Sequence, residues 1–233
     1  MREDGDLDAR QVMADLSSRG FSYVAAIPEG FDHLSWLRRL GPPMPQYGGE
    51  LVRDVRPDTD ADTGAYSTAA LPPHTEWYEF PDLPPRYVAL WCVTEGEGPG
   101  GETTLADGYS FLDELTPEER HRLLTEEQNW RSARTLLARE GVDQHSRHRI
   151  LSHHSGTLVM RFSTLDLQAE NGSDLARHYV TAGLKFFQAN HVAIKIQRNA
   201  MLVWDNWRMM HSRNGFTDRR RHLRRVLIRA RDA

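Results

Sequence analysis

Short apolar runs separated by turn residues are the feature of this sequence that most restricts its fold. Residues 86–93, 157–162 and 222–230 have the length and the β-branched and aromatic content of strands. Clusters of Gly, Pro, Asn and Asp separate such runs. Further strand-like runs lie at residues 21–27, 51–55, 132–138, 149–152 and 192–203. This pattern predicts a mainly β protein, a sandwich or barrel, with helical additions.

Helix signals occur at four places. Residues 8–19 and the segment from Asp32 to Leu40 carry partly periodic apolar residues, and residues 173–190 form an amphipathic pattern. Thr116-Pro117-Glu118-Glu119 has the composition of a capping box and predicts a helix to about residue 127. Residues 56–67 are polar; they could form a binding lid, although a solvated loop is favoured. Without repeats or a linker, residues 1–233 are predicted to form a single domain.

Composition and charge exclude several classes of protein. The net charge of −4 gives no general attraction to nucleic acid or to an anionic membrane, and no apolar run is long enough to span a bilayer. The first residues lack the apolar segment of a signal peptide. Cys92, the single cysteine, lies in an apolar run and is expected to be a buried thiol. These features predict a cytoplasmic protein without membrane or nucleic-acid partners; the oligomeric state stays open.

The stretch at residues 71–80 contains two side chains that can bind a metal, His74 and Glu76. In an extended chain, residues two apart point to the same face, so both could reach one ion. The His-x-Glu pattern alone is common by chance. A third ligand must therefore come from elsewhere in the chain.

His211 follows an apolar strand-like run at residues 200–204 and is expected just beyond a strand end. Two histidines and one carboxylate on one face of an ion form the facial triad of non-haem iron(II) oxygenases. The alternative is that His211 is an interior histidine satisfied by hydrogen bonds. The four histidines at 145, 148, 153 and 154 follow no zinc-finger spacing, and a polar loop is favoured there over a zinc site.

The arginine-rich segment at residues 219–229 favours the metal site over that alternative. Arg221, Leu223, Arg225 and Leu227 lie at even spacing and so share one face of a strand. Arginines that share a face with leucines are expected to point inward, where a guanidinium needs an anion. Arginine binds carboxylates in a bidentate way. A solvated or nucleic-acid-binding patch is the alternative, and the acidic balance of the chain disfavours it.

With these motifs together, the sequence resembles the iron(II)/2-oxoglutarate-dependent dioxygenases of the taurine dioxygenase superfamily. The resemblance covers residues 68–230. It rests on His-Thr-Glu at 74–76, Gly-Gly-Glu-Thr-Thr at 100–104 with Ala-Asp-Gly at 106–108, the segment 205–211, and the segment 221–225. It implies a double-stranded β-helix, or jelly roll.

The resemblance also implies roles for individual residues. His74, Glu76 and His211 would hold Fe(II) as the catalytic centre. Thr103 and Arg225 would bind the distal carboxylate of 2-oxoglutarate, and Arg221 would lie near the other end of this cosubstrate. O2 would react at an open position of the iron, and the cofactor chemistry would carry out the difficult step.

Glu76 narrows the expected reaction. Most of the superfamily has Asp at this position, whereas Glu resembles the clavaminate synthase and amino-acid hydroxylase branch, which acts on free or carrier-tethered amino acids in secondary metabolism. A halogenase of this type would have a small residue here. We therefore expect hydroxylation of a small polar metabolite such as an amino acid or derivative. Desaturation, cyclisation and epimerisation remain open, as does a metal-binding jelly roll without oxygen chemistry.

Candidates for substrate contact lie near the ligand motifs. Trp77 and Tyr78 follow the His-x-Glu motif directly, although core packing explains aromatic residues there equally well. Arg161 lies on a predicted strand and could pair with a substrate carboxylate or face the surface. Trp207 and Arg213 flank His211 and are candidates for the same reason.

Overall fold

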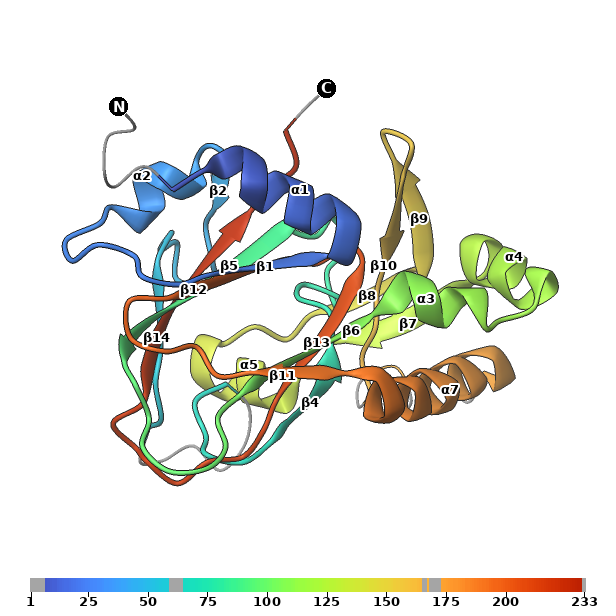
Figure 1. The fold of residues 1–233 in the computed structure, drawn as a ribbon. Helices are drawn as coiled ribbons and strands as arrows, with labels where there is room; N and C mark the ends of the chain where they lie inside the picture. Colours follow the sequence, from blue (N-terminus) through green and yellow to red (C-terminus); the bar gives the residue numbers. More distant parts are fainter. Residues whose placement is uncertain (1–6, 59–64, 165–166, 168–172, 232–233) are drawn as a thin grey trace.

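A computed structural model of the chain describes residues 7–58, 65–164, 167 and 173–231. Within these residues two antiparallel sheets lie face to face (Figure 1). The larger sheet has the order β1 (Phe21–Val24), β12 (Met201–Asp205), β5 (Tyr87–Thr94), β14 (His222–Ile228) and β2 (Pro43–Met44), and β3 (Arg53–Val55) also pairs with β14. The smaller sheet has the order β11 (Val192–Ile194), β6 (Thr103–Asp107), β13 (Met209–Arg213) and β4 (Leu71–His74). The predicted mainly β sandwich is confirmed.

Alternation along the strands builds separate layers of apolar packing. Leu90 and Leu223 point into the space between the two sheets, where they pack with Leu105 of the smaller sheet. Ala89 and Val226, which pair with each other at odd offsets from these leucines, point outward. There they are covered by α1 (Ala9–Arg19) and α2 (His33–Leu37). The central part of the larger sheet is therefore covered on both faces, while Arg224 of β14 and Asp54 of β3 stay exposed.

A second group of helices covers the other side of the molecule. These are α3 (Gly108–Asp113), α4 (Pro117–Thr125) and α7 (Asp174–Asn190), which pack together around Phe111, Leu123 and Tyr179 (Figure 1). Two short ribbons adjoin them: β7 (Glu127–Arg131) with β8 (His145–Arg149), and β9 (Leu151–His154) with β10 (Thr157–Met160).

The predicted helix signals act as expected. Thr116 Oγ1 accepts a hydrogen bond from the Glu119 N–H at 3.2 Å, and the Glu119 carboxylate accepts one from the Thr116 N–H at 2.8 Å. This capping box opens α4. Asp8, Asp32 and Ser173 cap the other three predicted helices.

Two sequence predictions for residues 132–154 are wrong. Residues 132–138, predicted as a strand, contain the start of helix α5 (Arg134–Glu140), which ends at Gly141 with φ +68°. The Leu, Ala, Arg and Glu content of this segment favours a helix, and Gly141 is a typical stop. The histidine-rich patch is not a loop, because two of its histidines lie on β8 and two on β9. Trp130 of β7 stacks on His148 with a ring distance of 5.1 Å, which helps hold the β7–β8 ribbon.

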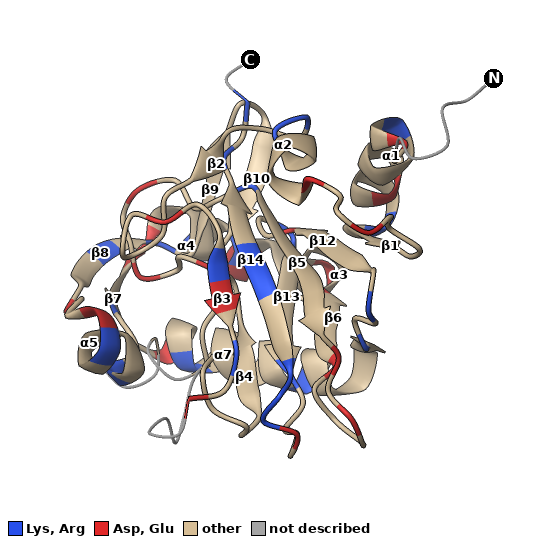
Figure 2. Cartoon of the chain, turned by 90° about the vertical axis from the view of Figure 1, so that its left-hand side faces the viewer, with Lys and Arg blue, Asp and Glu red and all other residues tan. Residues whose placement is uncertain are grey.

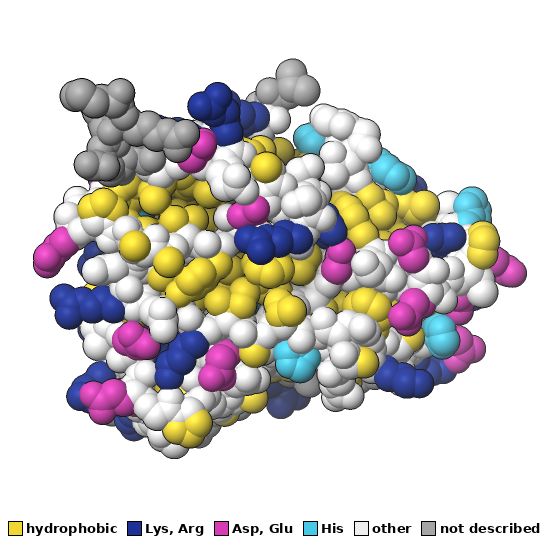
Figure 3. Space-filling view, in the orientation of Figure 1, with side chains coloured by type: hydrophobic (Ala, Val, Ile, Leu, Met, Phe, Trp, Pro, Cys, Tyr) yellow, Lys and Arg dark blue, Asp and Glu magenta, His cyan; other side chains and the backbone are white. Residues whose placement is uncertain are grey.

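Helix α3 was not predicted, and residues 59–64 of the predicted polar loop lie outside the described residues. None of the described helices is both long and apolar enough to cross a membrane. On the face drawn in Figure 3, basic and acidic side chains are interspersed. That face therefore offers no surface of a single charge for a polyanion.

Gly183 provides a test of how α7 packs. A Cβ at this position would lie 2.4 Å from Cε2 of Phe162 and 3.2 Å from Cε1 of Phe111, two fully buried rings. Gly183→Ala is therefore expected to destabilise the fold by roughly 1–3 kcal/mol through overpacking. Thr181→Ala, at an exposed position of the same helix, is the control and should change stability by less than about 0.5 kcal/mol. Chemical denaturation of both variants measures the difference; equal stability would show that α7 packs less tightly here.

Candidate active site

His74 and His211 come together because two strands of the smaller sheet pair. His74 ends β4, and its partner across the β4–β13 ladder is His211. The two imidazole centroids lie 4.1 Å apart. The prediction that His211 lies just beyond a strand end is wrong, because the residue lies within β13, the strand that follows the turn after β12.

Glu76 joins the two histidines from a turn. The chain leaves the extended conformation after His74, so Glu76 is not on the strand that the sequence argument assumed. One ligand atom from each of His74, Glu76 and His211 lies within 4.8 Å of the others. Nε2 of His211 is 3.7 Å from Oε2 of Glu76. This is too long for a hydrogen bond and matches two ligand atoms that share one ion, which lie roughly 3–4 Å apart with metal bonds of about 2 Å.

The protonation of the histidines fits a metal. Nδ1 of His74 lies 2.9 Å from the Pro72 carbonyl oxygen and donates to it, which leaves Nε2 with a lone pair. Burial lowers the pKa of His211 well below its usual value, and the neighbouring His74 and Arg225 lower it further. His211 is therefore neutral, as a metal ligand must be. Its Nδ1 is buried and has no hydrogen-bond partner within the described part of the chain. Two imidazole nitrogens and one carboxylate suit non-haem iron(II).

A cavity of about 730 Å³ lies beside these ligands. Its wall is largely apolar and aromatic, as is usual for small-molecule sites. Tyr47 and Trp77 stack within it with a ring distance of 5.2 Å. The volume is sufficient for a cosubstrate and a small metabolite together.

One end of the cavity is lined by Thr103, Arg213 and Arg221. Arg213 is the Cα partner of Thr103 across the β6–β13 ladder. The guanidinium groups of Arg213 and Arg221 each lie 5.0 Å from the ring centroid of Phe216. Arg221 donates to the Gly101 carbonyl oxygen at 2.9 Å. Gly101 has φ +77°, and a Cβ there would lie 3.0 Å from Nε of Arg221, so glycine allows this close approach.

The two buried arginines at this end of the cavity give it a positive charge that suits an anion. Burial lowers the pKa of Arg221 to about 10, and burial together with Arg221 lowers the pKa of Arg213 to about 10. Arg221 forms no ion pair with any acidic residue that the structure describes. A buried guanidinium whose acceptor is a neutral carbonyl would gain from a bound carboxylate.

Arg225 makes a different set of contacts. Its Nη1 donates to Oε1 of Glu76 at 2.8 Å, while the other oxygen of Glu76 faces His211. Its Nε donates to the Gln46 side chain at 2.9 Å. The carboxylate of Glu76 is therefore shared, with one oxygen toward Arg225 and the other toward the metal position.

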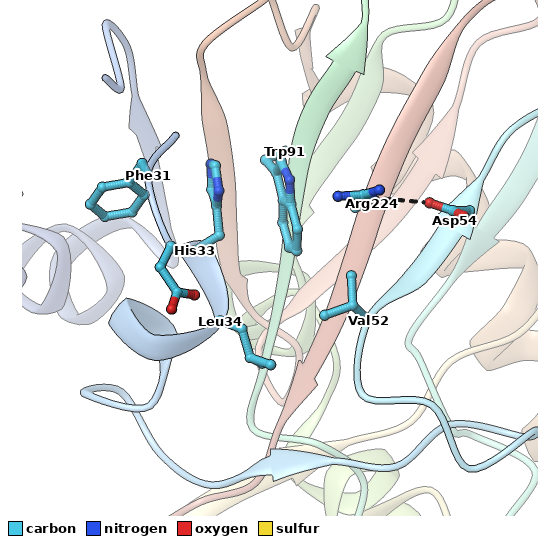
Figure 4. A pocket seen from close by; sticks show the side chains of 8 residues that line it. Phe31, His33, Leu34, Val52, Asp54, Trp91 and Arg224 are labelled. Carbon is cyan, nitrogen blue, oxygen red and sulfur yellow. Dashed lines mark hydrogen bonds and ion pairs between the residues drawn. The ribbon is translucent and has the colours of Figure 1, made fainter. Parts of the chain in front are cut away.

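The neighbouring Arg224 points to the opposite face of the larger sheet. There it pairs with Asp54 of β3 at 3.1 Å, beside a shallow hollow of about 360 Å³ in which His33 stacks flat on Trp91 (Figure 4). Figure 2 shows the basic segment of β14 next to the acidic tip of β3. The strand alternation thus places Arg225, and not Arg224, at the cavity.

The candidate substrate residues divide into two groups. Trp77, Tyr78 and Arg213 line the cavity. Arg161 and Trp207 are not part of its wall: Arg161 donates to the Asp82 carbonyl at 2.7 Å, and Trp207 donates to the Pro84 carbonyl at 3.0 Å. Both side chains are buried and hold the 82–85 segment in place.

The cavity wall formed by α5 and β3 contains charged residues that no sequence motif marks. Arg53 forms ion pairs with Glu140 of α5 and with Glu50, and Arg139 pairs with Asp58 at 2.9 Å. The guanidinium of Arg139 also lies 3.9 Å from the Tyr66 centroid. The strand predicted for residues 132–138 hid this wall, because the segment forms the start of α5 instead.

Comparison with known proteins agrees with this geometry. Residues 2–227 match the family described as taurine catabolism dioxygenase TauD, TfdA family. Gamma-butyrobetaine dioxygenase of Pseudomonas sp. (strain AK-1) is 27% identical over 180 residues, which are 71% of this chain and 44% of that protein. The chain thus spans less than half the length of this relative.

Solved structures share the fold. Asparagine oxygenase with Fe(II), 2S,3S-3-hydroxyasparagine and succinate has a TM-score of 0.76 at 18% identity, covering 94% of this chain and 78% of that one. The non-haem iron oxygenase OrfP with Fe, succinate and (3R,4R)-dihydroxy-L-Arg has a TM-score of 0.73 at 17% identity, covering 95% and 79%. These likenesses confirm the predicted jelly roll. By its match over residues 2–227, the chain belongs to the TauD, TfdA family of dioxygenases.

Proposed function

We propose that this protein is an iron(II)- and 2-oxoglutarate-dependent oxygenase that hydroxylates a small polar metabolite, an amino acid or a derivative of one. The observation that carries the proposal is the convergence of His74, Glu76 and His211 beside a cavity whose wall also contains two buried arginines, Arg213 and Arg221. The relatives named above support it, since their structures hold iron, succinate and hydroxylated amino acids. Another OrfP structure holds Fe and alpha-ketoglutaric acid, another name for 2-oxoglutarate.

His74, through Nε2, Glu76 and His211 would hold the iron. When bound, iron and 2-oxoglutarate supply the oxidising chemistry, in which O2 is consumed and the cosubstrate becomes succinate and CO2. The protein positions the reactants and keeps water out. Arg225 contributes by holding one oxygen of Glu76, so that the other is directed toward the metal position.

For the cosubstrate we propose a division of roles between Arg221 and Arg225 that differs from the one the resemblance implied. Thr103 keeps its role at the distal carboxylate of 2-oxoglutarate, with Arg221 and Arg213 as its partners. The support is geometric: these three residues line the same end of the cavity, and Arg221 has no acidic partner among the described residues. Arg225 already has a carboxylate partner in Glu76. Arg225 would therefore act on the cosubstrate and the substrate through the position of the Glu76 carboxylate.

The substrate is expected to occupy the part of the cavity between Trp77 and α5. The Tyr47–Trp77 stack offers a flat apolar surface there, and the Arg53–Glu140 pair offers both charges. A zwitterionic molecule such as an amino acid matches such a wall. We also propose a cytoplasmic location and a role in secondary metabolism, on the single buried Cys92 and on Glu76 respectively.

A screen of amino acids and their derivatives tests this function. The protein with Fe(II), 2-oxoglutarate and O2 is expected to release succinate faster with one candidate than without it. The product should be heavier by one oxygen atom. Loss of two hydrogen atoms would instead indicate desaturation or cyclisation. A chlorinated product in chloride buffer would contradict the proposal, because the Glu76 carboxylate occupies the position that a halide would need.

A further inference from the structure

Asn206 binds the main chain of Glu76 at two points. Its side-chain oxygen accepts a hydrogen bond from the Glu76 N–H at 2.7 Å, and its side-chain NH2 donates to the Glu76 carbonyl oxygen at 3.0 Å. The same NH2 group donates to the Pro85 carbonyl at 3.1 Å. Asn206 is completely buried, so no water competes for these bonds.

The segment held in this way is strained. Trp77, the residue after Glu76, has φ +69°, a left-handed conformation that is unfavourable for a bulky side chain. Such a conformation persists only where the surrounding structure fixes it. The two hydrogen bonds from the Asn206 side chain supply that constraint. They fix the N–H and the C=O of Glu76, and so the peptide groups on both sides of its Cα.

Asn206 also belongs to the segment that carries the third ligand. It lies in the turn between β12 and β13, five positions before His211 (211 − 206). Its own N–H donates to the Arg86 carbonyl at 2.8 Å, which anchors this turn to the start of β5. One side chain therefore connects the turn of Glu76 with the strand of His211, although the two segments are 130 residues apart.

We propose that Asn206 is a positioning residue of the metal site, which sets the direction of the Glu76 carboxylate relative to His211. The inference rests on the proposed iron site and adds a residue that touches neither the metal nor the cosubstrate. The contacts suit an amide, because one oxygen accepts from the Glu76 N–H while a separate NH2 group donates its two hydrogens to the Glu76 and Pro85 carbonyls. A hydroxyl group has a single hydrogen on a single atom and cannot make all three bonds.

The test is metal affinity in the absence of 2-oxoglutarate and substrate. Asn206→Ala is expected to bind Co²⁺ roughly 10–100-fold more weakly than the wild type, the usual effect of losing an outer partner of a metal ligand. Its Co²⁺ absorption spectrum should also change, because the carboxylate no longer meets the ion in the same geometry. In the metal-free protein, the amide of Glu76 should exchange its hydrogen faster.

Ser132→Ala is the matched control. Ser132 is also buried and also joins two main-chain groups, donating to the Val142 carbonyl at 3.1 Å and accepting from the Gln144 N–H at 3.0 Å. It should lose stability like Asn206→Ala and keep the Co²⁺ affinity and spectrum of the wild type. If Asn206→Ala does not fold, Asn206→Ser, too short to reach Glu76 but able to bind a water molecule, replaces it with the same expectation.

The outcomes separate this inference from the proposed function. Wild-type Co²⁺ affinity and an unchanged spectrum in the Asn206 variant, with binding lost in His74→Ala, would overturn the role of Asn206 alone. Unchanged binding in His74→Ala would instead overturn the metal site itself. Equal losses of affinity in Asn206→Ala and Ser132→Ala would assign the effect to stability and would also overturn the positioning role.

Discussion

The His74→Ala variant is expected to bind Fe(II) more weakly than the wild type by at least about 100-fold, a loss exceeding that from outer partners of metal ligands. The variant removes one of three ligand atoms that lie within 4.8 Å of one another. The remaining pair, Glu76 and His211, cannot form a facial triad. Anaerobic titration with Fe(II) or Co²⁺ measures the change.

His153→Ala serves as the control for this variant. His153 is exposed on β9 and lies in a group of histidines that includes none of the candidate metal ligands identified in the described part of the chain. Its replacement should leave the metal affinity unchanged. A loss of binding in His153→Ala with normal binding in His74→Ala would place the metal at the histidine-rich ribbons and contradict the proposed site.

The second large effect is expected for the cosubstrate. Arg221→Met should weaken anaerobic 2-oxoglutarate binding by roughly 30-fold or more, because removing one partner of a buried charge pair costs about 2–5 kcal/mol. Its affinity for the metal alone should stay close to that of the wild type, since Arg221 contacts Gly101 and not a metal ligand. Isothermal titration of the metal-loaded protein gives both values.

Arg225→Met is expected to show the opposite result. It removes the donor to Oε1 of Glu76, so metal binding should weaken by roughly 10-fold or more. Arg224→Met, which changes the neighbouring arginine on the outer face of the sheet, is the control for both variants. If Arg225→Met, and not Arg221→Met, abolishes 2-oxoglutarate binding, the roles implied by the resemblance are the correct ones. Wild-type binding in all three variants would favour a metal-binding jelly roll without oxygen chemistry.

The parts of this site that follow from residue type and local spacing could be predicted from the sequence. His74, Glu76 and His211 are metal-capable groups beside strand-like runs, and the strands do bring them together. The alternation in the last strand predicted that Arg225 shares a face with the inward-pointing leucines, and it does. Only the prediction for Arg225 follows from the period of a strand, because Glu76 lies in a turn after β4.

The parts that depend on contacts between distant residues could not be predicted. The turn at Glu76 requires the left-handed conformation of Trp77, and Asn206 stabilises this turn from 130 residues away. Helix α5 forms one wall of the cavity through Glu140, whose partner Arg53 is 87 residues earlier. The different contacts of Arg221, at Gly101, and of Arg225, at Glu76, also depend on residues distant in the sequence. Arg221 precedes β14, where the ladder with β5 shifts register, so it lies near Gly101.

The most direct test of the central claim is whether 2-oxoglutarate turnover depends on the three ligands. Wild-type protein with Fe(II), 2-oxoglutarate and O2 is expected to form succinate, and His74→Ala, Glu76→Ala and His211→Ala are expected to form none above the rate without protein. The Gly183→Ala variant, altered only in packing, should retain this activity in its folded fraction. Succinate formation at the wild-type rate in any of the three ligand variants would contradict the account.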